Sequence, residues 1–329
     1  MGIGPDQMVT AMRERTAFLF PGQGAQNVGM GRDWADQFPA ARAVYERADE
    51  ILGYSISRIC FEGPEDLLTR TVHAQPAIYV TSLAILAVLR EIYPDWKPYV
   101  AAGLSLGEFS ALAASGALAW EEALTLVARR ARAMEKAAQD HPGTMASVLG
   151  LPPAECEKVA AEAGVFVANL NSPDQTALSG TRESIEKACA LADERGAKRA
   201  LVLKVAGAFH SPLMLDAQTE LEAALAGTAM VRPSCLFIPN VTAEPAADPA
   251  RILELLSRQL TSPVRWSETV ARCSALGVHA ALEIGPGKVL RGLAKQCGAL
   301  WPVFSVGVVD DLKKLEAAVN QTNSSGGTL

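Results

Sequence analysis

A serine framed by two glycines is the clearest chemical signal in this chain. The segment Gly103-Leu104-Ser105-Leu106-Gly107 follows an apolar stretch, residues 99–102, that is typical of a strand, and an Ala- and Leu-rich helical pattern follows it. Gly-x-Ser-x-Gly between a strand and a helix is the signature of a nucleophile elbow, a turn so tight that only small residues fit beside the serine. Such a turn exposes the hydroxyl at the end of the sheet, so the pattern predicts that Ser105 is a covalent nucleophile.

A serine hydroxyl needs a general base within hydrogen-bond reach, and His210 is the best candidate. It follows an expected strand at 200–205 and directly precedes a helix start, with Ser211 as the N-cap and Pro212 at the first helical position. We expect His210 in a loop at the C-terminal edge of the sheet, the edge that also carries Ser105. The positive end of the following helix should keep the imidazole neutral. The alternative is a surface or helix-capping histidine.

An arginine on the apolar side of a predicted helix, residues 121–138, is the third candidate. Arg130 falls at helical spacing within an apolar stripe that consists of Ala123, Leu126, Val127, Met134 and Ala137. A guanidinium directed inward needs an anionic partner, because an unpaired buried charge is strongly destabilising. That partner is either an internal acid or a substrate carboxylate, which the planar guanidinium fits well; otherwise the side chain bends outward to solvent.

Acyl transfer through a serine also requires donors for the oxyanion. The backbone N–H of Leu106, directly after the nucleophile, is the usual first donor. The glycine-rich loop Gly22-Gln23-Gly24 follows an expected strand at 17–20 and is a candidate for the second. The same loop does not match a dinucleotide-binding fingerprint, because Asn27 stands where the third glycine is required.

The composition argues against several classes of protein. The 329 residues are 49% hydrophobic with a formal net charge of −6 and no Lys/Arg-rich run, which is atypical of nucleic-acid binding. No apolar run approaches the ~20 residues of a membrane span, and residues 1–15 lack a signal-peptide core, so we expect a soluble cytoplasmic protein without membrane contact. Six cysteines and four histidines stand without metal-ligand spacing, so neither a disulfide framework nor a metal site is expected.

The elements that must position these residues alternate between helical and strand patterns, which predicts an α/β fold with a mostly parallel sheet. A different rhythm, β-α-β-β-α-β, runs through 145–205 and is typical of a ferredoxin-like unit. We therefore expect a large α/β subdomain interrupted by a small α+β subdomain, with a ligand cleft between them. The expected boundaries are an N-terminal tail at 1–15, a large subdomain at 16–143 and 207–317, a small subdomain at 144–206, and a disordered tail at 318–329.

These motifs together resemble one known family, the malonyl-CoA:acyl carrier protein transacylases. The resemblance covers roughly residues 16 to 310, and the family's fold is an α/β-hydrolase-like core with a ferredoxin-like insert. The motifs that carry it, in order, are Phe20-Pro21-Gly22-Gln23-Gly24-Ala25-Gln26, the elbow with Glu108, Arg130 with Met134, Asn169-x-Asn171-Ser172-Pro173, Gly207-Ala208-Phe209-His210-Ser211 and Glu283-x-Gly285-Pro286-Gly287.

The resemblance implies a role for each candidate. Ser105 would be the acylated nucleophile, His210 its base, and Arg130 the partner of the malonyl carboxylate. The backbone N–H groups of Gln23 and Leu106 would form the oxyanion hole, and a backbone carbonyl near position 265 would orient the histidine in place of an acid. Malonyl would pass from malonyl-CoA to the serine and then to the phosphopantetheine thiol of an acyl carrier protein, without a metal or redox cofactor. We expect a monomer.

Three positions bear on selectivity. Leu104 stands where many members of the family carry His, and Arg265 stands where Gln is common. If the Arg265 side chain points into the cleft, it will alter the affinity for an anionic substrate. In related polyketide acyltransferases a bulky Phe before the histidine accompanies malonyl and a smaller residue accompanies methylmalonyl, so Phe209 favours malonyl.

Three other interpretations remain open from the sequence. The same serine and histidine would serve a hydrolase that releases acyl groups to water, or a polyketide-pathway acyltransferase with a different acyl group. A non-catalytic module that binds carrier proteins is the third. Because carrier proteins are acidic, we expect a basic patch near the cleft mouth, to which Arg129, Arg132, Lys204 and Lys288 are possible contributors.

Overall fold

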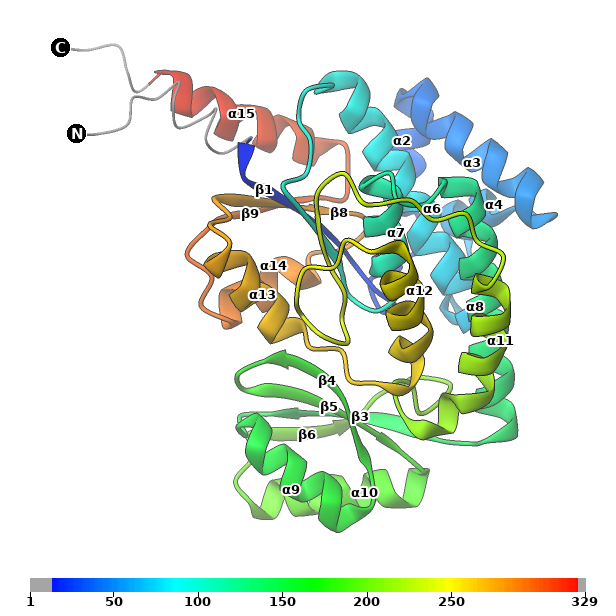
Figure 1. Cartoon of the computed structure of the whole chain (residues 1–329), viewed down its shortest axis with the longest axis vertical. Helices are drawn as coiled ribbons and strands as arrows, with labels where there is room; N and C mark the ends of the chain where they lie inside the picture. The colour runs from blue at the N-terminus through cyan, green and yellow to red at the C-terminus, as the bar shows by residue number, and fades with distance from the viewer. Residues whose placement is uncertain (1–13, 325–329) are drawn as a thin grey trace.

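The computed structural model describes residues 14–324, which are built around two sheets of different kinds (Figure 1). The larger sheet has five strands in the order β7-β2-β1-β8-β9, and all of its pairings are parallel. The predicted α/β fold with a mostly parallel sheet is therefore confirmed. The strands are β1 (Thr16–Phe20), β2 (Val100–Gly103), β7 (Leu236–Ile238), β8 (Ala280–Ile284) and β9 (Val303–Val306).

Helices cover both faces of this sheet, and the side chains of β1 show how the two cores are divided. Phe18 and Phe20 pack into one apolar cluster, whereas Ala17 and Leu19 pack into the other, as the two-residue period of a strand dictates. The first cluster lies against α3 (Pro39–Leu52), α6 (Thr71–Ile92), α7 (Gly107–Ala114) and α8 (Trp120–Asp140). The second lies against α13 (Trp266–Ala275) and α14 (Val289–Gln296).

The helix α6 has the length and composition of a membrane span, contrary to the expectation that no apolar run is so long. Its most apolar window has a mean hydropathy of 1.6, and 83% of that window is buried inside the protein. Burial of this kind is what the central helix of a layered core requires. Its polar residue Gln75 is equally buried and returns in the site described below.

The second sheet is antiparallel, with four strands in the order β4-β5-β3-β6. The helices α9 and α10 lie on its outer face, as Figure 1 shows, around an apolar cluster that includes Val148, Leu178 and Ile185. The expected β-α-β-β-α-β order is present, although the last strand ends at Val202 rather than at residue 205. The elements are β3 (Thr144–Leu149), α9 (Pro153–Ala163), β4 (Phe166–Ser172), β5 (Gln175–Gly180), α10 (Arg182–Glu194) and β6 (Arg199–Val202).

Backbone hydrogen bonds join the small sheet to the segment that precedes α13. Leu170 N–H donates to the Val264 carbonyl and Val264 N–H donates to the Ala168 carbonyl, each at 2.9 Å. These bonds fix the strand β4 of the small sheet to the segment that enters α13.

The remaining helices connect these layers. The last of them ends at Ser324, past residue 317, where we expected a disordered tail. Asp310 and Asp311 begin this helix and pair with Lys313 and Lys314 one turn later. Residues 1–13 and 325–329 of the two expected tails lie outside the described residues. These helices are α2 (Arg32–Gln37), α4 (Ile56–Glu62), α5 (Glu65–Thr69), the 3-10 turn η1 (Pro212–Met214), α11 (Leu215–Leu225), α12 (Pro249–Arg258), the 3-10 turn η2 (Gln259–Thr261) and α15 (Asp310–Ser324).

Candidate active site

The turn between β2 and α7 holds Ser105 in a strained conformation. Its φ of 51° lies in the left-handed region, which residues other than glycine rarely adopt. The flanking glycines permit the turn, because a Cβ on Gly103 would stand 2.0 Å from the backbone of Gly107 and a Cβ on Gly107 would stand 2.2 Å from the Phe20 carbonyl oxygen. The structure therefore has the geometry of the predicted nucleophile elbow, including the reason for both glycines.

The imidazole of His210 lies directly against the serine hydroxyl. The distance from Ser105 Oγ to His210 Nε2 is 2.9 Å, and the distance from His210 Nδ1 to the Gln259 carbonyl oxygen is also 2.9 Å. Because a carbonyl only accepts hydrogen bonds, Nδ1 carries the proton and Nε2 presents its lone pair to the serine. This arrangement can transfer the serine proton to His210. The backbone carbonyl that orients the ring thus belongs to Gln259, and the expectation of one near position 265 is wrong.

Two further expectations about His210 need correction. The strand before it, β6, belongs to the small antiparallel sheet, so His210 reaches the serine from the link between the two sheets rather than from the edge of the parallel sheet. Ser211 caps the turn that follows, as predicted, but that turn is only a short 3-10 segment. Burial first, and then the Arg130 charge, lower the pKa of His210 to about 4, so the ring is neutral for a different reason from the one expected.

Arg130 points inward, as its place in the apolar stripe predicts, with only 1% of the residue exposed. Its guanidinium donates to Gln75 Oε1 at 2.6 Å, to Gln259 Oε1 at 2.8 Å and to Ser105 Oγ at 3.0 Å. Its hydrogen-bond partners are amides and a hydroxyl, and no carboxylate among the described side chains forms an ion pair with it, although Glu108 acts on it from farther away. Burial lowers the pKa of Arg130 to about 10, so the group remains a cation at neutral pH and is available to an anionic ligand.

The glycine-rich loop lies beside the elbow. A Cβ on Gly22 would stand 2.4 Å from the Leu104 carbonyl oxygen, so only glycine allows the loop to come this close. Within residues 14–324, the backbone N–H groups of Gln23 and Leu106 donate no hydrogen bond. Both donors are therefore open to a ligand beside Ser105, and their predicted role in an oxyanion hole remains a prediction.

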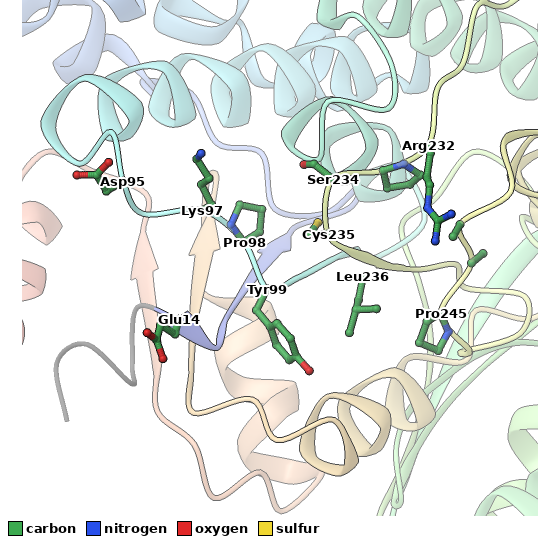
Figure 2. Close-up of a pocket in the computed structure, with 13 residues that line it drawn as sticks. Glu14, Asp95, Lys97, Pro98, Tyr99, Arg232, Ser234, Cys235, Leu236 and Pro245 are labelled. Carbon is green, nitrogen blue, oxygen red and sulfur yellow. The ribbon is translucent and has the colours of Figure 1, made fainter. Parts of the chain in front are cut away.

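Side chains from both sheets line a cavity of about 300 Å³ that contains Ser105. Phe209 and Lys204 line it from the link between the sheets, and Asn169 lines it from β4. A larger cavity of about 750 Å³ lies at the opposite edge of the parallel sheet, beside residues that precede β1, β2 and β7. Figure 2 shows the side chains that line it. Its lining residues include no hydrogen-bonded nucleophile and base, so the smaller cavity is the candidate active site.

Arg265 has no place in this cavity. Its side chain is partly exposed and forms an ion pair with Glu268 at 2.8 Å. The concern that its charge enters the cleft is therefore removed. Leu104 and Phe209 both line the cavity, the first beside the nucleophile and the second beside the base.

Four polar residues of the site were not assigned a function from the sequence. Gln75 and Gln259 hold the guanidinium, Asn240 Oδ1 accepts a hydrogen bond from the Ser105 N–H at 2.6 Å, and Glu108 is fully buried behind them. A signal existed for two of them, since Gln75 interrupts an apolar helical pattern and Asn240 follows a buried strand of the parallel sheet. The position of Gln259 depends on tertiary contacts.

Comparison with known proteins agrees with this geometry. A sequence model of the acyl transferase domain matches residues 17–318. The chain is similar to a malonyl CoA-acyl carrier protein transacylase of Bacillus subtilis, with 43% identity over 313 residues, 93% of this chain and 96% of the relative. The structure of a malonyl CoA-acyl carrier protein transacylase from Clostridium perfringens matches with a TM-score of 0.90 at 34% identity, over 95% of this chain and 100% of the other. A malonyl transacylase in complex with its type II polyketide acyl carrier protein matches with a TM-score of 0.88 at 34% identity, over 93% and 99%.

Proposed function

The chain belongs to the acyl transferase family, and on that premise we propose that it transfers a malonyl group from malonyl-CoA to the phosphopantetheine thiol of an acyl carrier protein. One observation carries the choice of acyl group. The nucleophile Oγ lies 2.9 Å from a neutral imidazole and 3.0 Å from a buried guanidinium that lacks a carboxylate partner among the described residues. A thioester substrate with a free carboxylate supplies that partner while its carbonyl carbon is held beside the serine.

In the first half-reaction, Ser105 gives its hydroxyl proton to Nε2 of His210 as Oγ attacks the thioester carbonyl. The negative oxygen of the tetrahedral intermediate is stabilised by the backbone N–H groups of Gln23 and Leu106. When the intermediate collapses, the carbon–sulfur bond breaks and the coenzyme A sulfur takes the proton from the imidazolium. The products are free coenzyme A and a malonyl ester on the serine.

The second half-reaction repeats these steps with another thiol. The phosphopantetheine thiol gives its proton to the same imidazole and attacks the ester, and the serine recovers its proton when the carbon–oxygen bond breaks. Since coenzyme A leaves before the carrier thiol attacks the malonyl ester, the mechanism is ping-pong. His210 serves as the base in both steps, and neither step uses a metal or redox cofactor. The similarity to the transacylase in complex with a carrier protein supports the choice of acceptor.

Phe209 is proposed to restrict the acyl group to malonyl, because its ring fills space beside the base where an α-methyl group would project.

The strand order β4-β5-β3-β6 supports the proposal that the small unit, 144–206, is ferredoxin-like. The elbow that follows a parallel strand supports an α/β-hydrolase-like large unit, 16–143 with 207–317. We also propose that the protein is cytoplasmic and monomeric, and sedimentation at micromolar concentration tests the monomeric state.

Intact-mass measurement tests the function. The protein is mixed with malonyl-CoA or acetyl-CoA, and phosphopantetheinylated acyl carrier protein is added afterwards. We expect an adduct of malonyl mass that moves to the carrier, little adduct from acetyl-CoA, and none on the Ser105→Ala variant. An adduct that decays to free acid at the same rate with and without the carrier would identify a hydrolase instead. No adduct from either thioester would reject the proposed substrate.

A further inference from the structure

A buried carboxyl group lies behind the candidate active site without touching its cavity. Glu108 is in the first turn of α7, three residues after the nucleophile, and it is completely inaccessible to solvent. It does not line the cavity that contains Ser105. A carboxyl group so deeply buried is costly to desolvate, so its presence calls for a specific set of partners.

Those partners are two donors from separate parts of the chain. The backbone N–H of Asn240, just after β7, donates to Oε1 of Glu108. The side-chain amide Nε2 of Gln259, at the end of α12, donates to Oε2. Each carboxylate oxygen therefore accepts one hydrogen bond, and each bond fixes a residue that itself contacts the reacting groups.

Gln259 is the first of these contacts, and it joins three functional groups. Its Oε1 accepts a hydrogen bond from Arg130 at 2.8 Å, and its Nε2 also donates to the Ser105 carbonyl oxygen at 2.9 Å. Its backbone carbonyl accepts the hydrogen bond from His210 Nδ1 at 2.9 Å. Because the amide of Gln259 has one oxygen and one nitrogen, the hydrogen bond to Glu108 also determines which of the two faces the arginine.

Asn240 is the second contact, and it holds the elbow. Its Oδ1 accepts a hydrogen bond from the Ser105 N–H at 2.6 Å, and its Nδ2 donates to the Gly103 carbonyl oxygen at 2.7 Å. The backbone N–H of the same residue is bound by Glu108. The carboxyl group thus fixes the residue that bridges the two sides of the strained turn.

From these contacts we propose that Glu108 is a positioning residue which aligns the nucleophile, its base and the arginine together, through Asn240 and Gln259. The inference rests on the proposed function and assigns a further residue to that reaction. Burial raises the pKa of Glu108 to about 8, whereas the two hydrogen bonds and the Arg130 charge act in the opposite direction. The ionised group suits this position because both of its oxygens are acceptors, whereas a carboxamide offers one acceptor and one donor. A role limited to stabilising the start of α7 would require neither of the two long-range hydrogen bonds.

The variant Glu108→Gln tests the proposal with almost no change in volume. In this variant either the Asn240 N–H or the Gln259 amide nitrogen faces the new NH2 group of residue 108, so two donors oppose each other. If the Gln259 amide rotated to remove this clash, its nitrogen would face the Arg130 guanidinium, which is also a donor. At pH 8.5, where Glu108 is mostly ionised, we expect kcat/KM for malonyl loading to fall about 10- to 100-fold per folded molecule, the usual effect of losing a buried hydrogen bond to a charged group. The acylation rate by p-nitrophenyl acetate, an ester without a carboxylate, should fall as well, because Ser105 and His210 are also misaligned.

Ser110→Ala is the matched control, because Ser110 is a buried residue of the same helix whose hydroxyl has no partner among the described residues. It should leave both rates unchanged. Glu108→Asp keeps the carboxylate, but its side chain is one methylene shorter and cannot reach both donors. We therefore expect malonyl loading and acylation by p-nitrophenyl acetate to fall as they do in the amide variant. Circular dichroism and the melting temperature of each variant give the folded fraction to which the rates are normalised.

Three outcomes would overturn the proposal. The first is a Glu108→Gln protein that loads malonyl within twofold of the wild type, and the second is a loss confined to malonyl with p-nitrophenyl acetate unaffected. The third is failure of both Glu108 variants to fold while Ser110→Ala folds, since the carboxyl group would then serve folding alone. If the wild type reacts with p-nitrophenyl acetate but never loads malonyl, the proposed function fails, and the ester rates still decide the role of Glu108.

Discussion

Replacement of Arg130 by alanine should impair malonyl loading without impairing the acylation of Ser105 by a substrate that lacks a carboxylate. The guanidinium is 1% exposed and is held by neutral amides of Gln75 and Gln259, so a bound carboxylate would form a buried ion pair with it. Removing one partner of a buried ion pair costs about 3–5 kcal/mol. At 1.36 kcal/mol for each factor of ten, kcat/KM for malonyl-CoA should fall roughly 10²- to 5 × 10³-fold.

The assay is the rate of intact-mass increase on Ser105 with malonyl-CoA and with acetyl-CoA. Acetyl loading does not use the ion pair, and it should be retained or rise, because the hydrogen bond from Arg130 to the nucleophile is gone. Arg129→Ala, on the exposed side of the same helix, is the control and should behave as the wild type. Arg130→Lys should recover only part of the malonyl rate, because lysine restores the positive charge but cannot form the two parallel hydrogen bonds that a guanidinium gives to a carboxylate. Malonyl loading by Arg130→Ala within fivefold of the wild type would refute the carboxylate clamp.

Four further predictions concern the neighbouring groups. The pKa of His210 is lowered from 6.5 to about 4 by burial and by Arg130, so the profile of kcat/KM for loading should have no acid limb centred near pH 6.5. A limb at that pH would contradict the neutral, buried base. Between pH 6.5 and 4 only the unfolded chain takes up the His210 proton, so the contribution of His210 to the free energy of unfolding should decrease as pH falls, which urea titrations of the wild type and of His210→Gln measure as a difference. The comparison with the variant is needed because Glu108, whose pKa is raised to about 8, changes stability in the opposite direction. Gly22→Ala should lower kcat for malonyl loading up to about 10²-fold by moving the Gln23 N–H, whereas Gly227→Ala, where a Cβ meets nothing, is the control; an unchanged kcat would remove that N–H from the mechanism. Phe209→Leu should raise loading of methylmalonyl relative to malonyl in a competition read by mass, and an equal ratio would exclude Phe209 from selectivity.

The sequence is most informative where local rules decide the structure. The elbow could be predicted because its glycines, the strand before it and the helix after it are consecutive in the chain. Arg130 could be predicted because a single charge on an apolar helical face has few stable solutions. The strand and helix order of the small sheet also follows from local periodicity and turn residues, and only the end of β6 differs.

What could not be predicted depends on contacts between distant segments. Gln259 lies 154 positions after Ser105 in the sequence, yet its side chain donates to the serine carbonyl oxygen. No pattern around Gln259 shows that its backbone carbonyl, rather than one near position 265, faces His210. The cause of the lowered pKa of His210 is likewise tertiary, because burial between two sheets has no signature in the residues beside it.

The backbone at Ser105 and His210 has a consequence for how this protein can change over generations. Both residues have positive φ, 51° and 58°, in a conformation that costs about 1–2 kcal/mol for a side chain and almost nothing for glycine. Ser105→Gly and His210→Gly should therefore be inactive and yet fold more stably, provided that the lost side-chain contacts cost less than the relieved strain. A library selected for heat resistance alone would be enriched in inactive proteins of this kind. Only selection for turnover keeps the two strained residues in the lineage.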